Sequence, residues 1–175
     1  MKYSLEGHQF AIFGFKLTSD LRYIVSVSNK FITWDVSTSD MARQVNPGVD
    51  GLMMGLEISP DNRFVAAYTS NNQTVLLNTL VSEYLIIDSP LEANESVQGI
   101  CMFDVSMVIY GQSSWVLFDM SGKQIEKKKT LREVPILQMI MMGKDDYTII
   151  HWSGDMAKPE MAIVTCKVFF IRIIS

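Results

Sequence analysis

Basic residues, cysteine and histidine are all scarce in this chain of 175 residues. Fifteen Lys and Arg stand against nineteen Asp and Glu, which leaves a formal net charge of −4. Proteins that bind phosphate backbones use clustered cations, so the composition predicts no nucleic-acid partner. The two cysteines, Cys101 and Cys166, are too far apart in the sequence to form a metal or redox motif. Such low cysteine usage favours a reducing compartment, and we expect a cytoplasmic protein.

The signatures of catalysis and of cofactor binding are missing as well. His8 and His151 are the only histidines, and they form no metal-ligand cluster with the distant cysteines. No glycine-rich loop is followed by Lys-Ser or Lys-Thr, so no phosphate cradle is predicted. No serine lies in the sequence context of a nucleophile elbow. The sequence therefore predicts no catalytic residue, no metal, no cofactor and no enzymatic activity.

Long apolar runs are also lacking. Residues 1–9 contain no apolar core of the signal-peptide type. The most apolar stretch, residues 161–174, is interrupted by Lys167 and Arg172 and is too short to span a bilayer. The sequence therefore predicts no membrane partner.

What the chain does contain is a series of short apolar runs separated by polar turns. The clearest series lies in residues 7–35, which open with Gly7-His8 and close with Trp34-Asp35. Its runs, residues 11–17, 23–27 and 31–34, are rich in the β-branched and aromatic residues that strands favour. Polar residues that favour turns, among them Ser19-Asp20, separate the runs. This pattern predicts three strands joined by tight turns.

The same pattern returns along the chain with a constant spacing. The pair that ends the third run, Trp34-Asp35, is followed by Leu77-Asn78 after 43 residues and by Phe118-Asp119 after a further 41. The second runs, residues 22–26 and 63–67, are separated by 41 residues. Two separate landmarks thus give one period of about 40–45 residues, which is the period of four-stranded propeller blades.

The period predicts an all-β fold, an incomplete β-propeller of about three and a half four-stranded blades. The predicted blades are residues 7–45, 46–88, 95–129 and 134–155. After Asp155 the expected third strand, ending in an aromatic residue and Asp, does not follow. We therefore predict that residues 156–175 form an atypical apolar tail in place of the rest of the last blade.

Gly7-His8, the Ser-Asp turns and Trp34-Asp35, at a period near 42, together resemble the WD-repeat propeller family over roughly residues 1–155. The resemblance implies a structural network within the first blade, to which we assign His8, Ser26, Trp34 and Asp35. The Asp that this family places in the turn after the second strand is absent, and the turn offers Asn29 instead. The degenerate second and third blades are also similar to the WD-repeat region of NACHT and WD-repeat proteins, which implies a cytosolic signalling segment.

The leading functional prediction is a protein–protein interaction scaffold within a larger cytosolic signalling or regulatory protein. The loops that enter the second and third blades carry acidic residues, and we predict a partner-binding rim at Asp50, Asp88, Glu92 and Glu95. Such a rim would attract a basic peptide, although ordinary solvated loops would have the same composition.

Three and a half blades are too few to close by themselves, because propellers have four to eight blades. We therefore expect a fragment of a longer propeller, or self-association through the open edge blades. Two alternatives remain: a truncated isoform without independent activity, and an enzyme with its site in the propeller channel.

Overall fold

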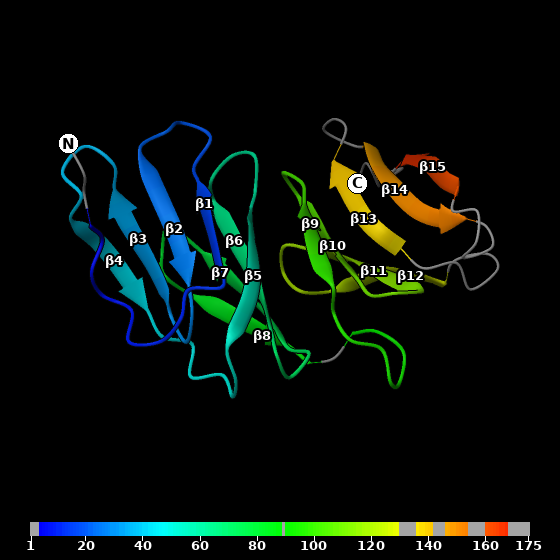
Figure 1. Ribbon diagram of the computed structural model, residues 1–175, viewed down its shortest axis with the longest axis horizontal. Coiled ribbons are helices and arrows are strands. Elements are labelled where there is room, and N and C mark those ends of the chain that lie inside the picture. The colour runs from blue at the N-terminus through cyan, green and yellow to red at the C-terminus, as the bar shows by residue number, and fades with distance from the viewer. Residues whose placement is uncertain (1–3, 89, 130–135, 142–145, 154–159, 168–175) are drawn as a thin grey trace, which may run out of the picture.

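The computed structural model describes residues 4–88, 90–129, 136–141, 146–153 and 160–167, and their strands form four antiparallel sheets (Figure 1). We call these sheets blades 1 to 4. Blade 1 contains β1 (Gly14–Leu17), β2 (Tyr23–Val27), β3 (Phe31–Asp35) and β4 (Met41–Val45). Blade 2 contains β5 (Met53–Ile58), β6 (Phe64–Thr69), β7 (Thr74–Asn78) and β8 (Tyr84–Ile87). Blade 3 contains β9 (Gly99–Met102), β10 (Ser106–Tyr110), β11 (Ser114–Asp119) and β12 (Gln124–Lys129), and blade 4 contains β13 (Ile136–Met141), β14 (Asp146–Ser153) and β15 (Glu160–Lys167).

Within each blade, the strands lie in the order in which they occur along the chain. This order results from hairpin turns with a repeated hydrogen-bond pattern. In blade 1, the Thr18 hydroxyl accepts the Tyr23 N–H at 3.0 Å and donates to the Asp20 carboxylate at 2.6 Å. In blade 2, Ser59 accepts the Phe64 N–H at 2.9 Å in the same way. A hydroxyl at the end of the first strand thus closes the turn into the second.

The blades lie side by side, with the first strand of each blade next to the first strand of the following one (Figure 1). Backbone hydrogen bonds join successive blades at corresponding places. The Met53 N–H donates to the Ser28 carbonyl between blades 1 and 2, at 2.7 Å. The Ile136 N–H donates to the Gln112 carbonyl between blades 3 and 4, at 2.6 Å. These bonds fix the start of each first strand against the turn of the blade before it.

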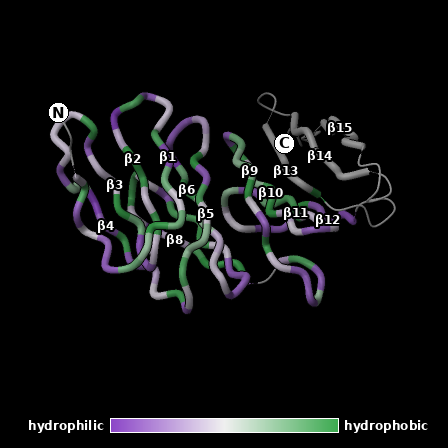
Figure 2. The backbone as a smooth tube through the Cα atoms, viewed as in Figure 1, coloured by the Kyte–Doolittle hydropathy of each residue, from purple (hydrophilic) through white to green (hydrophobic). Residues whose placement is uncertain are grey.

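The described part of the core contains three apolar clusters, one at each junction between blades. Val27 and Phe31 of blade 1 pack with Met53 and Val65 of blade 2, and all four side chains are almost completely buried. Every residue of β10 is buried, because apolar clusters lie on both sides of blade 3. Figure 2 shows the apolar residues concentrated along the strands and the hydrophilic residues in the connecting loops.

The observed strands of blades 1 to 3 lie within the blade ranges predicted from the repeat. One difference concerns the predicted tail, because β15 falls within it and pairs with β14 over eight residues. Backbone pairing does not require an aromatic-Asp end, so the missing motif did not prevent a third strand. The other tail residues, 156–159 and 168–175, lie outside the described residues, as do residues 1–3. The described part of the chain has no helix that could cross a membrane.

Candidate functional site

Three of the four residues assigned to the structural network are hydrogen-bonded to one another. The Trp34 indole N–H donates to Ser26 Oγ at 2.8 Å, and Ser26 Oγ lies 2.7 Å from His8 Nε2. Ser26 and Trp34 are buried. Burial, together with the nearby charge of Lys30, lowers the pKa of His8 and favours the neutral ring. In that ring Nε2 can accept the Ser26 hydroxyl proton.

Some buried polar atoms of blade 1 and of the segment before it are without hydrogen-bond partners in the described part of the chain. His8 Nδ1 and Asn29 Oδ1 are buried and have no hydrogen-bond partner among the described residues.

Asp35 is not a member of the network, because its carboxylate accepts the Ser37 hydroxyl and the Ser37 N–H. These bonds hold the pKa of the Asp35 carboxyl below its ordinary value. Asp35 therefore stabilises the turn between β3 and β4.

The network holds the segment before β1 against blade 1. At Gly7 the segment passes so close to the sheet that a Cβ atom would lie 2.7 Å from the Met41 side chain and 2.9 Å from that of Trp34. Glycine is therefore required by the close approach. His8, the next residue, then reaches Ser26 on β2. This arrangement explains why Gly-His and Trp belong to one local pattern.

Blade 1 has one face that none of the other described blades covers, which we call the open face. It presents Phe13, Phe15 and Leu17, which alternate along one side of the first strand and are 41%, 72% and 47% exposed. Phe13 belongs to this row because its N–H donates to the Val27 carbonyl and extends the pairing of β1. The neighbouring side chains of Phe10 and Ile12 are exposed as well.

The other blades show what such a row does when a blade lies next to it. Phe15 pairs with Ser26, Leu56 of blade 2 pairs with Ala67, and Ile100 of blade 3 pairs with Ile109, so the three occupy corresponding positions. Leu56 is 7% exposed and Ile100 is 5% exposed, because each packs in the cluster shared with the preceding blade. Phe15 has the same place in its blade, and none of the blades in the described part of the chain covers it.

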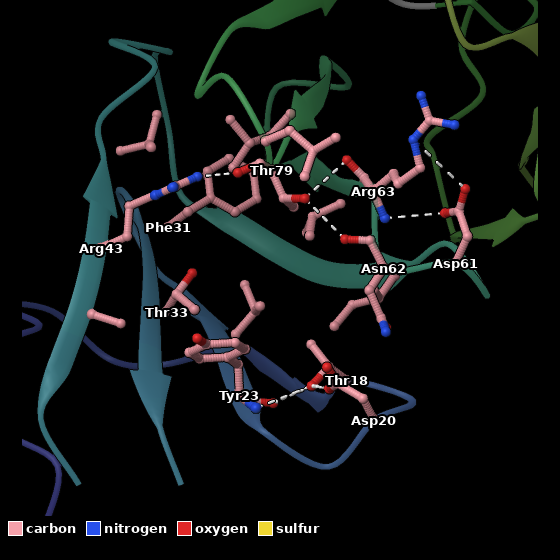
Figure 3. Close-up of a pocket in the computed structure, with 17 residues that line it drawn as sticks. Thr18, Asp20, Tyr23, Phe31, Thr33, Arg43, Asp61, Asn62, Arg63 and Thr79 are labelled. Atoms are coloured by element: carbon pink, nitrogen blue, oxygen red, sulfur yellow. Dashed lines mark hydrogen bonds and ion pairs between the residues drawn. The ribbon is translucent and has the colours of Figure 1, made fainter. Parts of the chain in front are cut away.

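A pocket of about 440 Å³ lies between blades 1 and 2 (Figure 3). Tyr23, Phe31, Thr33 and Arg43 line it from blade 1, and side chains of blade 2 line it from the opposite side. The Arg43 guanidinium donates to the Thr79 carbonyl and so links β4 to the turn after β7. The sequence-based predictions did not include this pocket. They included self-association through the open edge blades, but they did not identify the exposed side chains of the open face.

The acidic residues of the predicted rim lie in the loops as expected, but three of the four carboxylates contact the protein itself. Asp88 accepts the Gln73 amide N–H at 2.8 Å, and Glu92 pairs with two lysines of β12, Lys127 and Lys129. Those lysines lower the pKa of Glu92.

Glu95 accepts the Ser114 N–H at 2.9 Å and also accepts the hydroxyl of Ser114. The backbone carbonyl of Asp50 accepts the Asn71 amide N–H at 3.1 Å. Partner binding by the rim stays a prediction. Within the described ranges, no group of three or more His, Cys, Asp and Glu could hold a metal ion.

Comparisons with known proteins show which fold these blades form. No protein-family model and no curated protein matches the sequence. Among solved structures, the WD40 repeats of RRP9 match 91% of this chain with a TM-score of 0.68 and 15% sequence identity. This chain has a WD40 β-propeller fold. The β-propeller domain of Myceliophteria thermophila Cps50 (Swd1) matches 85% of the chain, with a TM-score of 0.66 and 16% identity.

A third match, Kuenenia stuttgartiensis hydrazine synthase, has a TM-score of 0.64 and 14% identity over 85% of the chain. At such low identities the matches establish the fold alone. The chain spans only 52%, 51% and 46% of the three matched structures. The predicted all-β, incomplete WD40-type propeller is therefore confirmed. The comparisons give no support to the narrower resemblance to NACHT and WD-repeat proteins.

Proposed function

We propose that this WD40-type segment is a protein-interaction scaffold that binds through the open face of blade 1. A WD40 propeller is a fold that generally mediates protein–protein interaction, and rigid blades of this kind carry partners on their surfaces. The occupant that the open face fits is the apolar face of another blade. When the chain is studied by itself, a second copy supplies the blade that covers the open face. Two copies together have about the length of one matched propeller, because the chain spans about half of each matched structure.

The observation that carries this proposal is the exposure of Phe15 at 72% where Leu56 and Ile100 are buried. Contiguous exposed apolar side chains on a soluble protein mark interaction sites, and closing a propeller removes its free sheet edges. Two copies that bind head to tail can also form a closed ring. A heterologous interface gives a ring when the rotation that relates the copies adds up to a full turn.

Sedimentation velocity over a roughly hundredfold range of protein concentration tests the proposal, because association follows mass action. We expect the sedimentation coefficient to rise with concentration for the natural chain. The double variant F15S/L17S should remain monomeric over that range. A matched variant, V105S/I125S, removes two exposed apolar side chains from blade 3 and should associate normally. Equal behaviour of the natural chain and F15S/L17S would contradict the proposal.

We further propose that the segment acts in the cytoplasm, without catalysis, as part of a larger regulatory protein. The support for the compartment is Cys101, a free and buried thiol of the kind that a reducing environment preserves. Burial raises the pKa of this thiol to about 12, which leaves it unreactive at neutral pH. A broad screen for hydrolase activity tests the non-catalytic role, and reproducible turnover that a single substitution abolishes would refute it.

A further inference from the structure

The pocket between blades 1 and 2 exists because blade 1 has polar residues where blade 2 has leucines. Thr33 of β3 pairs with Arg43 of β4, and at the corresponding positions of blade 2 Leu76 of β7 pairs with Leu85 of β8. Leu76 is buried in the cluster between blades 2 and 3, and Leu85 packs against that cluster. The same space between blades 1 and 2 is left as a cavity of about 440 Å³.

The walls of this cavity combine apolar side chains with polar and charged ones. Phe31, Val65 and Leu77 line it and belong to the core cluster of blades 1 and 2. Tyr23 and Thr33 lie on the same wall as Arg43 (Figure 3). A cavity of this size that joins an apolar surface to polar and charged side chains has the form of a ligand pocket, which typically measures about 300–1,000 Å³.

The charged side chains that line the pocket differ in their hydrogen-bond and ion-pair partners. The Asp20 carboxylate accepts the Thr18 hydroxyl and the Arg22 N–H. The Asp61 carboxylate accepts the Ser59 hydroxyl and the Arg63 N–H, and it also lies 3.9 Å from Arg63 Nε.

Arg43 differs from these groups. Within the described part of the chain, no carboxylate lies at ion-pair distance from its guanidinium, which donates to the Thr79 carbonyl. A guanidinium has five N–H donors, so most of its binding capacity remains for a ligand. Figure 3 shows Asp20 at the opposite end of the pocket from Arg43, so an anionic group is expected on the Arg43 side.

We propose that this pocket binds the carboxy-terminal residue of a partner polypeptide, with an apolar side chain in the cavity and the α-carboxylate on Arg43. A planar guanidinium matches a carboxylate through two parallel hydrogen bonds. In a carboxy-terminal residue, the apolar side chain and the α-carboxylate are attached to the same Cα atom. The side chain can therefore enter the cavity while the carboxylate contacts Arg43, which lines it. The pocket is separate from the open face and binds its ligand in the monomer.

Nuclear magnetic resonance titration of the full chain tests the proposal with three probes. N-acetyl-phenylalanine has both groups, N-acetyl-phenylalaninamide lacks the charge, and N-acetyl-glycine lacks the apolar side chain. We expect saturable shifts of the Thr33, Arg43 and Thr79 amide signals with N-acetyl-phenylalanine. The amide should bind about tenfold more weakly, since a hydrogen bond to a charged group contributes at least that factor. Equal affinity for the acid and the amide, or the absence of saturable shifts, would overturn the proposal.

Two variants connect binding to the pocket. T33L/R43L copies the leucine pair of blade 2, fills the cavity and should abolish binding while the spectrum stays dispersed. R43Q leaves the cavity open and should remove the preference for the acid over the amide. F15S/L17S, which alters only the open face, is the matched control and should bind normally. If R43Q retains the tenfold preference for the acid, Arg43 is not the carboxylate ligand and the proposal fails.

Discussion

At the scale of single residues, Ser26 is the centre of the most specific interaction in blade 1. Its hydroxyl lies 2.8 Å from the Trp34 indole nitrogen and 2.7 Å from His8 Nε2. Blade 2 has Ala67 and Leu77 at the corresponding positions, and both are buried. These two positions of a blade can therefore both be apolar, as in blade 2, or both be polar and hydrogen-bonded to each other, as in blade 1. A mixture of the two leaves a buried donor without an acceptor, which is unfavourable.

We predict that S26A lowers the free energy of unfolding by roughly 1–3 kcal/mol, because Trp34 then has a buried N–H without its acceptor. In a W34L background the same substitution should lower it by less, since that pair reproduces blade 2. Urea denaturation of the four proteins in this double-mutant cycle measures the difference. Equal effects of S26A in both backgrounds would show that the Trp34 bond does not contribute.

The ring of His8 gives a prediction about pH. Its pKa in the folded chain is lowered by burial and by Lys30, so the folded state disfavours the proton relative to the unfolded state. Stability should therefore fall as the pH drops from about 7.5 to about 5.5, through the unfolded pKa near 6.5. The variant H8Q should lose less stability over that interval, and His151 is common to both proteins. An identical pH dependence in H8Q would refute this role of His8.

The network could be predicted only through the resemblance to the WD-repeat family, because His8, Ser26 and Trp34 lie at the positions that the resemblance assigns to it. The hydrogen bonds between them are seen once the strands are paired. The exposure of Phe15 could not be predicted from the sequence. The first strands of blades 1 to 3 have an apolar residue at this position, whether a neighbouring blade covers it or not. The pocket could have been found by aligning Thr33 and Arg43 with Leu76 and Leu85, but only once the strand pairing was known.

At the scale of elements, the turns between first and second strands hold neighbouring blades together. Asn62 accepts the Ser19 N–H at 2.9 Å and donates to Ser19 Oγ at 2.7 Å, which links the turn of blade 2 to that of blade 1. Asn62 and Leu21 occupy corresponding positions and both have a left-handed backbone, with φ of 62° and 61°. Asn tolerates this conformation better than Leu does.

These two positions form a matched pair for substitution by glycine. N62G removes the link between the blades and should lower the free energy of unfolding by about 1 kcal/mol. L21G relieves an unfavourable backbone conformation without removing such a link, and should raise it by a similar or smaller amount. Thermal or urea denaturation checks both. A stabilising effect of N62G would show that the link to Ser19 contributes little.

Elements were the part of the fold that the sequence predicted best. The pairs Trp34-Asp35, Leu77-Asn78 and Phe118-Asp119 mark the ends of the third strands at a regular spacing, so the strands of blades 1 to 3 could be placed from the period of the repeat. The third strand of blade 4, β15, was missed because it lacks these end signals. Its pairing with β14 depends on backbone groups, which every sequence provides.

At the scale of the whole molecule, the described residues form a row of blades, and no described blade covers the outer face of the first one. Each junction between blades buries one apolar cluster, and the open face of blade 1 has the side chains for one more. This surface depends on the arrangement of the blades, and no single residue signals it. Association through the open face requires that Phe15 and Leu17 become buried when two copies bind.

Oxidative footprinting with hydroxyl radicals measures this burial directly. The natural chain is labelled at a low and at a high concentration, and side-chain oxidation is quantified by mass spectrometry. We predict that Phe15 and Leu17 are oxidised several-fold less at the high concentration, because a second copy covers them. Oxidation of Val105 and Ile125, which are exposed on blade 3, should not change. Unchanged oxidation of Phe15 in a sample that sedimentation shows to be associated would contradict association through the open face, as would a chain that stays monomeric with Phe15 exposed.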